Sequence, residues 1–594
     1  MCGITTIFSY GERAPIVDKK ELTAIHNNLA PRGPDGEGVW IAENQKLAMA
    51  HRRLSIIDTT DNGAQPMVSA DASLRIVYNG EIYNFRELRR QLSESGVIFF
   101  SDSDTEVLLH LYARHGFEMV QKLRGMFAFV IWDQKRRGLF LARDAFGIKP
   151  LYFSDDGKTI RIASQVKSLV AGKKISNKPE PAGHVGFFLL GSVPDPYTLY
   201  KEIKALPAGS SMWVDHSGSN TSKKWFNLRK ELVEIEPKPF NQEEVTDALV
   251  DTVRHHLIAD VPVGLFLSSG LDSATLTALA SEEQGEELRT VTLGFESYRE
   301  SKNDEVPLAE IMARHCKTKH QTKWIGTNDF KGNFEKLFKA MDQPSIDGTN
   351  VFFVSKIARE AGLKVAISGI GGDEIFGGYN SFQQVPGLAK ILSIFQFVPM
   401  LGRTIRILSA PIVRQLASPK YASIFEYGST IEDAYFLRRG LFMPWELPEI
   451  LDPSLVRAGL EEISIFNRLK DLIFRARSNR IAITALETNW YLNHQLLRDS
   501  DWAGMANSLE IRTPLVDVTF LRKLAPMLAG SQAPTKQHLA RSPSVQLPAE
   551  IINRRKTGFN VPLPQWIIPP ENSGRKVDMR QWALFVYNQQ WSGD

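Results

Sequence analysis

The stretch Leu265-Phe266-Leu267-Ser268-Ser269-Gly270-Leu271-Asp272-Ser273 joins an apolar run to a turn of small, hydroxyl-bearing residues. An apolar run that ends at Ser and Gly is typical of a strand buried in a sheet, and the residues from about Asp272 onward predict a helix. Turn amides and helix N-termini bind phosphate, although the same pattern also fits a simple helix cap. The stretch therefore predicts a strand, a turn and a helix, with a candidate anion site at the turn.

The second half of the chain repeats this rhythm, with helix-like segments between strand-like runs. The runs are Val263–Leu267, Thr290–Phe295, Gln321–Ile325 and Val365–Ile367. This alternation predicts an α/β domain with a parallel, doubly wound sheet, in which ligands bind at the carboxyl ends of the strands. A second glycine-rich turn, Ser368–Gly372, ends one of these strands, and a helical region is expected from Tyr379 to about Asn507.

The first half has short alternating runs instead, which favour antiparallel sheets. They are Leu74–Tyr78, Met126–Trp132, Gly138–Ala142 and Thr159–Ala163. Helical periodicity at Phe85–Ser95 and Thr105–His115 adds helices between the strands. We therefore expect a layered α+β domain in the first half.

Polar and charged stretches separate the two halves. Asp215–Lys224 is polar and Arg229–Pro239 is charged, so both are interpreted as connector. We predict a first domain at residues 2–215, a linker at 216–240, a second domain at 241–570 and a C-terminal tail at 571–594. A chain of 594 residues is long enough for two such domains.

The composition is that of an ordinary globular enzyme, with a formal net charge of +4 spread along the chain. The sequence lacks the concentrated basic patch that would indicate a nucleic-acid partner. Two cysteines cannot build a disulfide framework, and we see no signal segment, so a cytoplasmic location is expected. The most apolar stretch, Pro386–Ala417, is interrupted by Lys and Arg, which predicts no membrane span. It is interpreted as helices packed on the second domain, with an amphipathic surface segment as the alternative.

Cys2 is a candidate nucleophile because a small residue at position 2 usually permits removal of the initiator Met. The free α-amine of Cys2 can then act as the base for its own thiol. Position alone is weak evidence, since a lone Cys is more often an inert apolar residue. The blocks that accompany Cys2 are Arg32–Gly36, His51–Asp58, Tyr78–Glu81 and Ser103–Glu106.

With Met1–Ile4, these blocks occur in the order and spacing of a class II glutamine amidotransferase domain, which the first half resembles. The resemblance implies an αββα fold of the N-terminal nucleophile type. It also implies that Asn79 and the amide of Gly80 form an oxyanion hole. The glutamine-binding residues implied by the resemblance are Arg53, Leu54, Ile56, Asn79, Gly80, Glu81 and Asp104. Arg53 would pair with the α-carboxylate of glutamine, and Glu81 with Asp104 would hold its ammonium group.

The second half resembles the asparagine synthetase domain, which is an ATP pyrophosphatase. Leu267–Ser273 is similar to the pyrophosphate loop S-G-G-x-D-S, with Ser269 in place of the usual Gly, and Ser368–Tyr379 is similar to the second signature. The ATP-binding residues implied are Leu267, Ser268, Ser269, Gly270, Asp272, Ser273, Leu293, Ser368 and Gly369. Asp272 and Asp373 would hold Mg²⁺ on the pyrophosphate. ATP and Mg²⁺ are thus the expected cofactors, with AMP and pyrophosphate as products.

Two further blocks continue the resemblance. Asn553–Phe559 contains Lys556, a candidate catalytic cation that would neutralise charge as pyrophosphate leaves. Ala506–Asp517 is similar to another family block, for which a role in shaping the acceptor pocket and a role in bracing the sheet are both open.

The resemblance implies a glutamine-dependent asparagine synthetase that adenylates aspartate and aminates it. Ile370 stands where the best understood family members have Glu, and Gln343 and Asp499 also depart from the common pattern. Two alternatives therefore stay open. One is the same chemistry on another carboxylate, such as a uronic acid of a surface polysaccharide. The other is a regulatory or binding protein with a decayed synthetase half. The partners expected are small molecules only, and the oligomeric state is open, a homodimer included.

Overall fold

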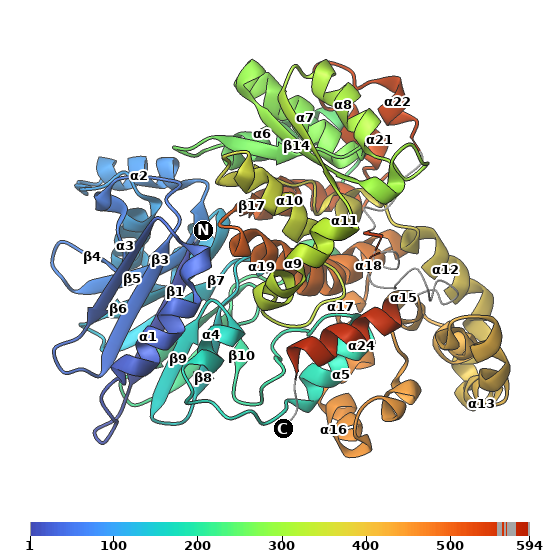
Figure 1. Cartoon of the computed structure of the whole chain (residues 1–594), viewed down its shortest axis with the longest axis horizontal. Helices are drawn as coiled ribbons and strands as arrows, with labels where there is room; N and C mark the ends of the chain where they lie inside the picture. The colour runs from blue at the N-terminus through green and yellow to red at the C-terminus, as the bar shows by residue number, and fades with distance from the viewer. Residues whose placement is uncertain (1, 555–560, 563–565, 567–577, 592–594) are drawn as a thin grey trace.

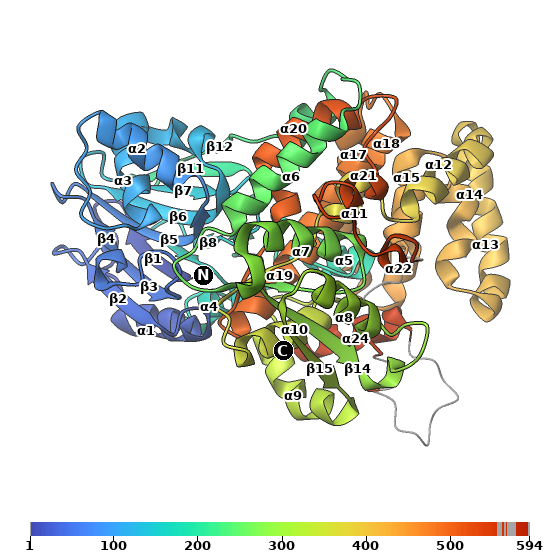
Figure 2. The same cartoon turned by 90° about the horizontal axis from the view of Figure 1, so that it is seen from above.

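The computed structural model describes residues 2–554, 561–562, 566 and 578–591, which form three β-sheets and a large helical region (Figure 1). Figure 2 shows the N-terminal sheets on one side of the molecule and the helices between residues 381 and 439 on the opposite side. The sheets divide between the two halves of the chain, as the sequence predicts.

The first half contains two six-stranded antiparallel sheets, with the strand orders β10-β8-β9-β1-β3-β2 and β12-β11-β7-β6-β5-β4. The first sheet consists of β1 (Gly3–Ser9), β2 (Gly36–Ile41), β3 (Leu47–Arg53), β8 (Tyr152–Asp155), β9 (Thr159–Ala163) and β10 (Lys204–Ala205). The second consists of β4 (Met67–Val68), β5 (Leu74–Ile82), β6 (Gly125–Asp133), β7 (Gly138–Arg143), β11 (Ser210–Asp215) and β12 (Asn220–Lys224).

Alternating side chains of both sheets meet in one buried core, to which Ile4, Met49, Val77 and Val130 belong. Helices α1 (Lys19–Asn28) and α4 (Val166–Ala171) contribute to the core on the other face of the first sheet. Helices α2 (Phe85–Glu94) and α3 (Asp104–His115) pack on the second sheet. These four layers confirm the predicted αββα arrangement.

The second half contains one five-stranded parallel sheet with the order β15-β14-β13-β16-β17. Its strands are β13 (Val263–Phe266), β14 (Arg289–Phe295), β15 (Lys319–Ile325), β16 (Val365–Ile367) and β17 (Glu510–Arg512). The helices between them are α7 (Leu271–Gln284), α8 (Val306–His315), α9 (Thr327–Ala340) and α10 (Thr349–Glu360), preceded by α6 (Gln242–His256). The predicted parallel α/β sheet is confirmed.

The expected helical region is also confirmed. It comprises α12 (Ser381–Leu392), α13 (Pro399–Leu416), α14 (Ile424–Tyr427), α15 (Ile431–Arg439), α16 (Pro453–Ile463), α17 (Ile465–Ile473), α18 (Asn479–Leu486), the π-helical η10 (Glu487–Leu497) and α19 (Arg498–Ala506). The long block Ala506–Asp517 includes strand β17, which lies at the edge of the parallel sheet beside β16. Helix α20 (Val518–Leu528) follows it.

Two segments differ from the expectation. Part of the stretch interpreted as connector, Asn220–Lys224, is the edge strand β12, which pairs with β11 although all five of its side chains are exposed. Backbone hydrogen bonds hold it, and these leave no hydrophobic pattern in the sequence. Within the expected C-terminal tail, Met579–Gln590 forms helix α24, whose Trp582 is 1% exposed. Its buried aromatic face belongs to the core rather than to a free tail.

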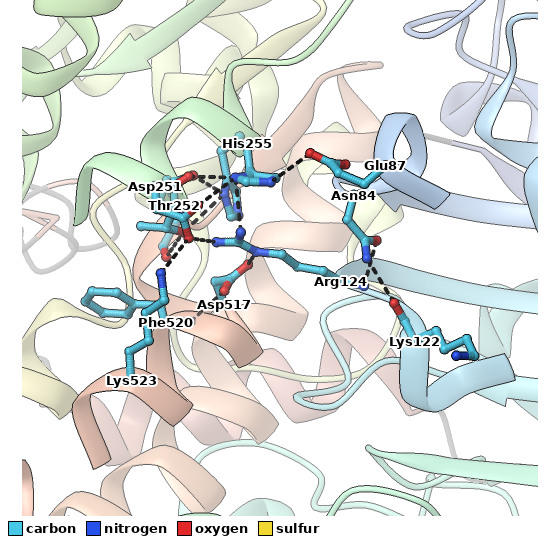
Figure 3. Close-up of polar contacts among 12 residues, drawn as sticks. Asn84, Glu87, Lys122, Arg124, Asp251, Thr252, His255, Asp517, Phe520 and Lys523 are labelled. Atoms are coloured by element: carbon cyan, nitrogen blue, oxygen red, sulfur yellow. Dashed lines mark hydrogen bonds and ion pairs between the residues drawn. The ribbon is translucent and has the colours of Figure 1, made fainter. Parts of the chain in front are cut away.

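Arg124 is one of the contacts that join the two halves (Figure 3). It lies just before β6, and its guanidinium reaches Asp517 Oδ2 at 2.8 Å, Asp251 Oδ2 at 3.0 Å and His255 Nδ1 at 3.0 Å. Asp251 and His255 come from α6, while Asp517 caps α20 through the amide of Phe520. Because Arg124 is only 7% exposed, the cation needs both carboxylates to offset its desolvation.

We expect Arg124→Ala to weaken this junction strongly, because it leaves Asp251 and Asp517 without their buried cation. Breaking a buried ion pair costs about 3–5 kcal/mol. Lys523→Ala is the matched control, since Lys523 also contacts Asp251, at 3.2 Å, but is largely exposed. Its loss should cost less than about 1 kcal/mol. Thermal unfolding and limited proteolysis of the 226–244 region would compare the two variants. Equal effects of both would contradict the assignment.

Candidate functional site

Cys2 lies at the start of β1, buried between elements of the first half. Its backbone N–H donates to Asn79 Oδ1 at 2.9 Å, so the predicted nucleophile and the predicted oxyanion residue are adjacent. Burial raises the pKa of the Cys2 thiol. The Nδ2 group of Asn79 is buried and has no hydrogen-bond partner among the described residues. A free, fixed donor of this kind is suited to an oxygen that becomes negative during reaction.

Gly80 follows Asn79 on β5 and is closely packed. A Cβ at this position would lie 2.1 Å from the carbonyl oxygen of Met126, which no side chain could tolerate. The backbone at Gly80 can therefore approach its neighbours only because the residue is Gly. The structure thus brings Cys2, Asn79 and Gly80 together at one end of the paired strands β5 and β6.

The two predicted ammonium ligands are buried carboxylates. Asp104, at the start of α3, accepts hydrogen bonds from Tyr78 Oη at 2.9 Å and from the amide of Ile82 at 3.0 Å, and burial raises its pKa to about 6. Glu81 lies 5% exposed on β5, where burial and the nearby Glu510 raise its pKa well above the usual range. A cationic ligand group would relieve the cost of ionising both.

The remaining residues predicted to bind glutamine lie at the end of β3 and directly after it. The Arg53 guanidinium donates to the carbonyl oxygens of Thr60 and Asp58, the first at 2.7 Å, so backbone oxygens fix its position. Leu54 and Ile56 are 3% and 1% exposed and belong to the hydrophobic core. Any contact of these two residues with a ligand must therefore come from the backbone.

Arg32 connects this site to the second half, a role that sequence reasoning missed. Its Nε donates to the carbonyl oxygen of Cys2 at 3.0 Å, while Nη1 and Nη2 reach the two oxygens of Asp501 at 2.7 Å and 3.0 Å. Asp501 lies on α19, and both side chains are nearly fully buried. The backbone of Cys2 is thereby tied to a helix of the other half.

A cavity of about 1310 Å³ lies at the carboxyl ends of the parallel strands. Every residue predicted to bind ATP or Mg²⁺ lines it: Leu267, Ser268, Ser269, Gly270, Asp272, Ser273, Leu293, Ser368, Gly369 and Asp373. The turn after β13 and the turn after β16 thus face one space, as expected for an open α/β sheet.

The turn before α7 is held by its own hydroxyl groups. Ser268 Oγ and Ser273 Oγ are 2.8 Å apart, and the Gly270 amide donates to Ser268 Oγ at 3.1 Å. Ser269, which replaces the usual Gly, is 2% exposed, and its Oγ has no partner among the described residues. The hydroxyl is therefore available to a ligand without any other bond being broken.

Lys536 lies between the two predicted Mg²⁺ ligands and was not predicted as a site residue. Its Nζ contacts both oxygens of Asp272 and lies 2.9 Å from Asp373 Oδ1. Although burial lowers the pKa of Lys536, the two carboxylates raise it above its usual value. Sequence proximity gave no signal, because Lys536 begins a short helix more than 150 residues after Asp373. Asp272 and Asp373 already share one cation, Lys536, so their positions also suit a metal cation.

A Mg²⁺ ion needs more oxygen ligands than these two carboxylates supply. Among the described residues, no group of three or more His, Cys, Asp or Glu side chains is placed to hold a metal. Asp272 and Asp373 therefore fit Mg²⁺ only together with phosphate oxygens and water, as for a metal that arrives with a nucleotide. The predicted cation Lys556 lies outside the described residues.

The departures from the family pattern fall in two places. Ile370 and Asp499 line the 1310 Å³ cavity, whereas Gln343 lines a separate space of about 280 Å³. Asp499 accepts from Ser345 Oγ and Trp502 Nε1, both at 2.7 Å, and burial followed by the charge of Asp347 raises its pKa to about 7. Asp347 also lines the cavity. Neither carboxylate has an ion pair among the described residues.

The comparisons with known proteins agree with this geometry. Residues 1–226 match the family described as "Glutamine amidotransferase domain" and residues 244–578 match the family described as "Asparagine synthase". "Asparagine synthetase [glutamine-hydrolyzing] 1" of Bacillus subtilis is 33% identical over 98% of this chain and 89% of its own. "Putative asparagine synthetase [glutamine-hydrolyzing] 2" of Methanocaldococcus jannaschii is 36% identical over 68% of this chain and 80% of its own.

A third relative carries a different name. "Amidase chry2" of Gibberella zeae is 28% identical over 64% of this chain and 60% of its own. The first relative covers nearly the whole chain, and the two family matches together span both halves described above. With its glutamine amidotransferase half and its ATP-pyrophosphatase-type half, this chain is a glutamine-hydrolysing ligase that belongs to the asparagine synthetase family.

Proposed function

We propose that the protein makes asparagine from aspartate, using ammonia released from glutamine and converting ATP to AMP and pyrophosphate. We assign glutamine hydrolysis to residues 2–215 and the synthetase reaction to residues 241–570. The observation that carries the proposal is that Arg32 contacts both the backbone of Cys2 and Asp501, so the two sites belong to one buried assembly.

In the first half-reaction, the thiolate of Cys2 attacks the side-chain carboxamide of glutamine. The tetrahedral oxygen would receive hydrogen bonds from Asn79 Nδ2, which has no other partner among the described residues, and from the Gly80 amide. Collapse breaks the C–N bond and releases ammonia, leaving a thioester that water hydrolyses to glutamate. Glu81 and Asp104 would hold the α-ammonium group, and Arg53 the α-carboxylate.

In the second half-reaction, an oxygen of the aspartate side-chain carboxylate attacks the α-phosphorus of ATP, and pyrophosphate leaves. The turn Ser268–Ser273 would hold the departing pyrophosphate, with Asp272 and Asp373 on its Mg²⁺. Lys536 already lies at these carboxylates and can supply positive charge to the same phosphates. Lys556 is proposed to act near the α-phosphate. Ammonia then attacks the adenylate, AMP leaves and the amide forms.

The function is tested by measuring pyrophosphate release from the purified protein with glutamine, ATP-Mg²⁺ and a panel of carboxylic acids. Aspartate should give the highest rate, with AMP, pyrophosphate and asparagine in equal amounts. Stoichiometric ADP and phosphate would contradict the adenylate mechanism. No turnover with any acid would favour the alternative of a regulatory protein with a decayed synthetase half.

The same assay tests whether glutamine hydrolysis and amidation occur at separate sites. Cys2→Ala should abolish glutamine-driven amidation but keep amidation from added ammonium, because only the first half-reaction needs the thiol. Equal loss with both nitrogen sources in a folded variant would show that the two sites are not separable as proposed.

A second candidate acceptor is another carboxylate, such as a uronic acid of a polysaccharide. The observation that favours it is the lining of the cavity, where Ile370 stands in place of the carboxylate of the common family pattern. Ile370 cannot take a proton from attacking ammonia, so a base must come from elsewhere. Asp499 is suited to be this base, because burial raises its pKa to about 7, close to neutral pH.

The substitution Ile370→Glu separates the two acceptors. A missing general base costs about 10²–10⁴-fold in rate, so the new Glu should raise asparagine formation if aspartate is the acceptor. If the cavity is adapted to a larger carboxylate, a buried Glu would instead repel the substrate and lower turnover. Ile370→Gln is the matched control, because the Gln side chain has a shape similar to that of Glu but cannot act as a base. A gain with Gln equal to that with Glu would contradict the base argument.

The role of Asp104 predicts a pH dependence for glutamine hydrolysis. Its raised pKa of about 6 means that the carboxylate is ionised above this pH and loses its charge as the pH falls through it. Because only the ionised form attracts the ammonium group of glutamine, kcat/KM for glutamine should fall about 10-fold from about pH 7 to about pH 5. Amidation from added ammonium, compared at a constant concentration of free ammonia, should lack this acidic limb. Asp104→Asn should lower kcat/KM and remove the limb, and an unchanged limb would exclude Asp104 as its origin.

A further inference from the structure

Helices α12 and α13, with the short turn between them, project from the side of the molecule opposite the N-terminal sheets (Figures 1 and 2). We call residues Ser381–Leu416 the apolar hairpin. Among the described residues no single helix is both long and apolar enough to cross a membrane. The bent pair Ser381–Phe397 and Met400–Leu416 reaches that length and apolar composition only when both parts are taken together.

The apolar hairpin exposes a concentration of large apolar side chains. Of the 19 exposed large apolar side chains among the described residues, 10 lie between residues 391 and 416. They are Ile391, Ile394, Phe397, Val398, Met400, Leu401, Ile407, Leu408, Ile412 and Leu416. Phe397 is 78% exposed and Leu416 is 82% exposed. A contiguous apolar surface of this kind marks an interaction site, whereas scattered single residues do not.

The other face of α13 is packed, so its outward face is fixed. A Cβ at Gly402 would lie 2.4 Å from the carbonyl oxygen of Phe425, which shows how closely the helix approaches α14. Arg406 pairs with Glu426 on the same side, and the rings of Phe395 and Phe425 lie 4.9 Å apart. Leu401, Leu408 and Ile412 follow one another at helical spacing on the opposite, exposed side.

The charge of this segment is one-sided. No Asp or Glu occurs between Glu374 and Glu426, while the same segment carries the basic residues Lys390, Arg403, Arg406, Arg414 and Lys420. The whole chain, by contrast, has nearly equal numbers of both signs. Arg406 and Arg414 pair with Glu426 and Glu449, whereas Lys390 and Arg403 have no ion pair among the described residues. These two cations stand among exposed apolar side chains.

We propose that the apolar hairpin docks the protein on the surface of an anionic lipid bilayer, with its apolar face in the interface. Exposed apolar side chains interspersed with Lys and Arg, and without carboxylates, are what such a surface attracts. A second copy of this chain is a poorer occupant, because an isologous contact would bring the two basic segments together. The helices do not need to span the membrane for this role.

Docking would hold the synthetase cavity next to the bilayer. Gly378 and Tyr379, which line the cavity, lie only two or three residues before α12 begins. Arg438, which also lines the cavity, donates to Gln384 of α12 at 2.9 Å. The inference goes beyond the proposed reaction and does not depend on which acceptor the enzyme uses.

The test is co-sedimentation of the purified full-length protein with vesicles of phosphatidylcholine, with and without phosphatidylglycerol. Binding should require the anionic lipid and weaken at high salt. The double variant Phe397→Ser with Leu408→Ser should lower binding about 10-fold or more, because it removes two of the most exposed apolar anchors. Arg403→Glu should also lower binding while leaving the apolar face intact.

Phe100→Ser is the matched control, since Phe100 is 71% exposed but lies in the N-terminal half. It should bind vesicles like the wild type. All variants should keep ATP-dependent pyrophosphate release with soluble substrates, which shows that they are folded and separates this test from the proposed function. Absence of vesicle binding, or equal binding by the hairpin and control variants, would overturn the proposal. The proposal would also be overturned if light scattering showed that the wild type is a dimer and that the hairpin variants are not.

Discussion

The arrangement of both sites depends on the buried ion pair between Arg32 and Asp501. A buried ion pair stabilises a protein only if every donor and acceptor is satisfied, because two charges have been removed from water. Here Arg32 binds Asp501 with two nitrogens and gives its third to the carbonyl oxygen of Cys2. The pair thereby specifies a geometry rather than only adding stability. The backbone of Cys2 cannot shift without disturbing α19 of the second half.

Arg512 makes a second connection of the same kind. It lies on the edge strand β17, donates to the carbonyl oxygens of His256 and Ile258, and pairs with Glu510 at 2.6 Å. Its Nη2 lies 3.6 Å from Glu81 of the glutamine site. The cation therefore partly offsets the burial that raises the pKa of Glu81. The electrostatics of the first site are set in part by the sheet of the second.

The limits of sequence reasoning follow from which interactions are local. Strands such as Thr159–Ala163 and Val365–Ile367 were predicted at their observed bounds, because burial of a strand leaves a pattern in the sequence. Strand β12 was missed because backbone pairing alone holds it. Residues that the family motifs single out do lie together: Cys2 contacts Asn79, and the turns after β13 and β16 line one cavity, while their roles stay predictions. The positions of Lys536 and Arg32 depend on contacts between residues far apart in the chain, which periodicity does not record.

The carboxylates at the predicted ligand positions differ in how much positive charge the protein places beside them. Asp272 and Asp373 share Lys536, a cation that can be replaced when metal and phosphate arrive together. Glu81 has Arg512 only at 3.6 Å. Asp347 and Asp499 have no ion pair among the described residues, and burial raises the pKa of both. A buried carboxylate is costly to ionise until a positive charge reaches it. Acceptors that carry an ammonium group near their carboxylate would meet this need, and aspartate is one of them. The family motifs therefore indicate the reaction class, while the acceptor stays a proposal that depends on the cavity lining around Ile370.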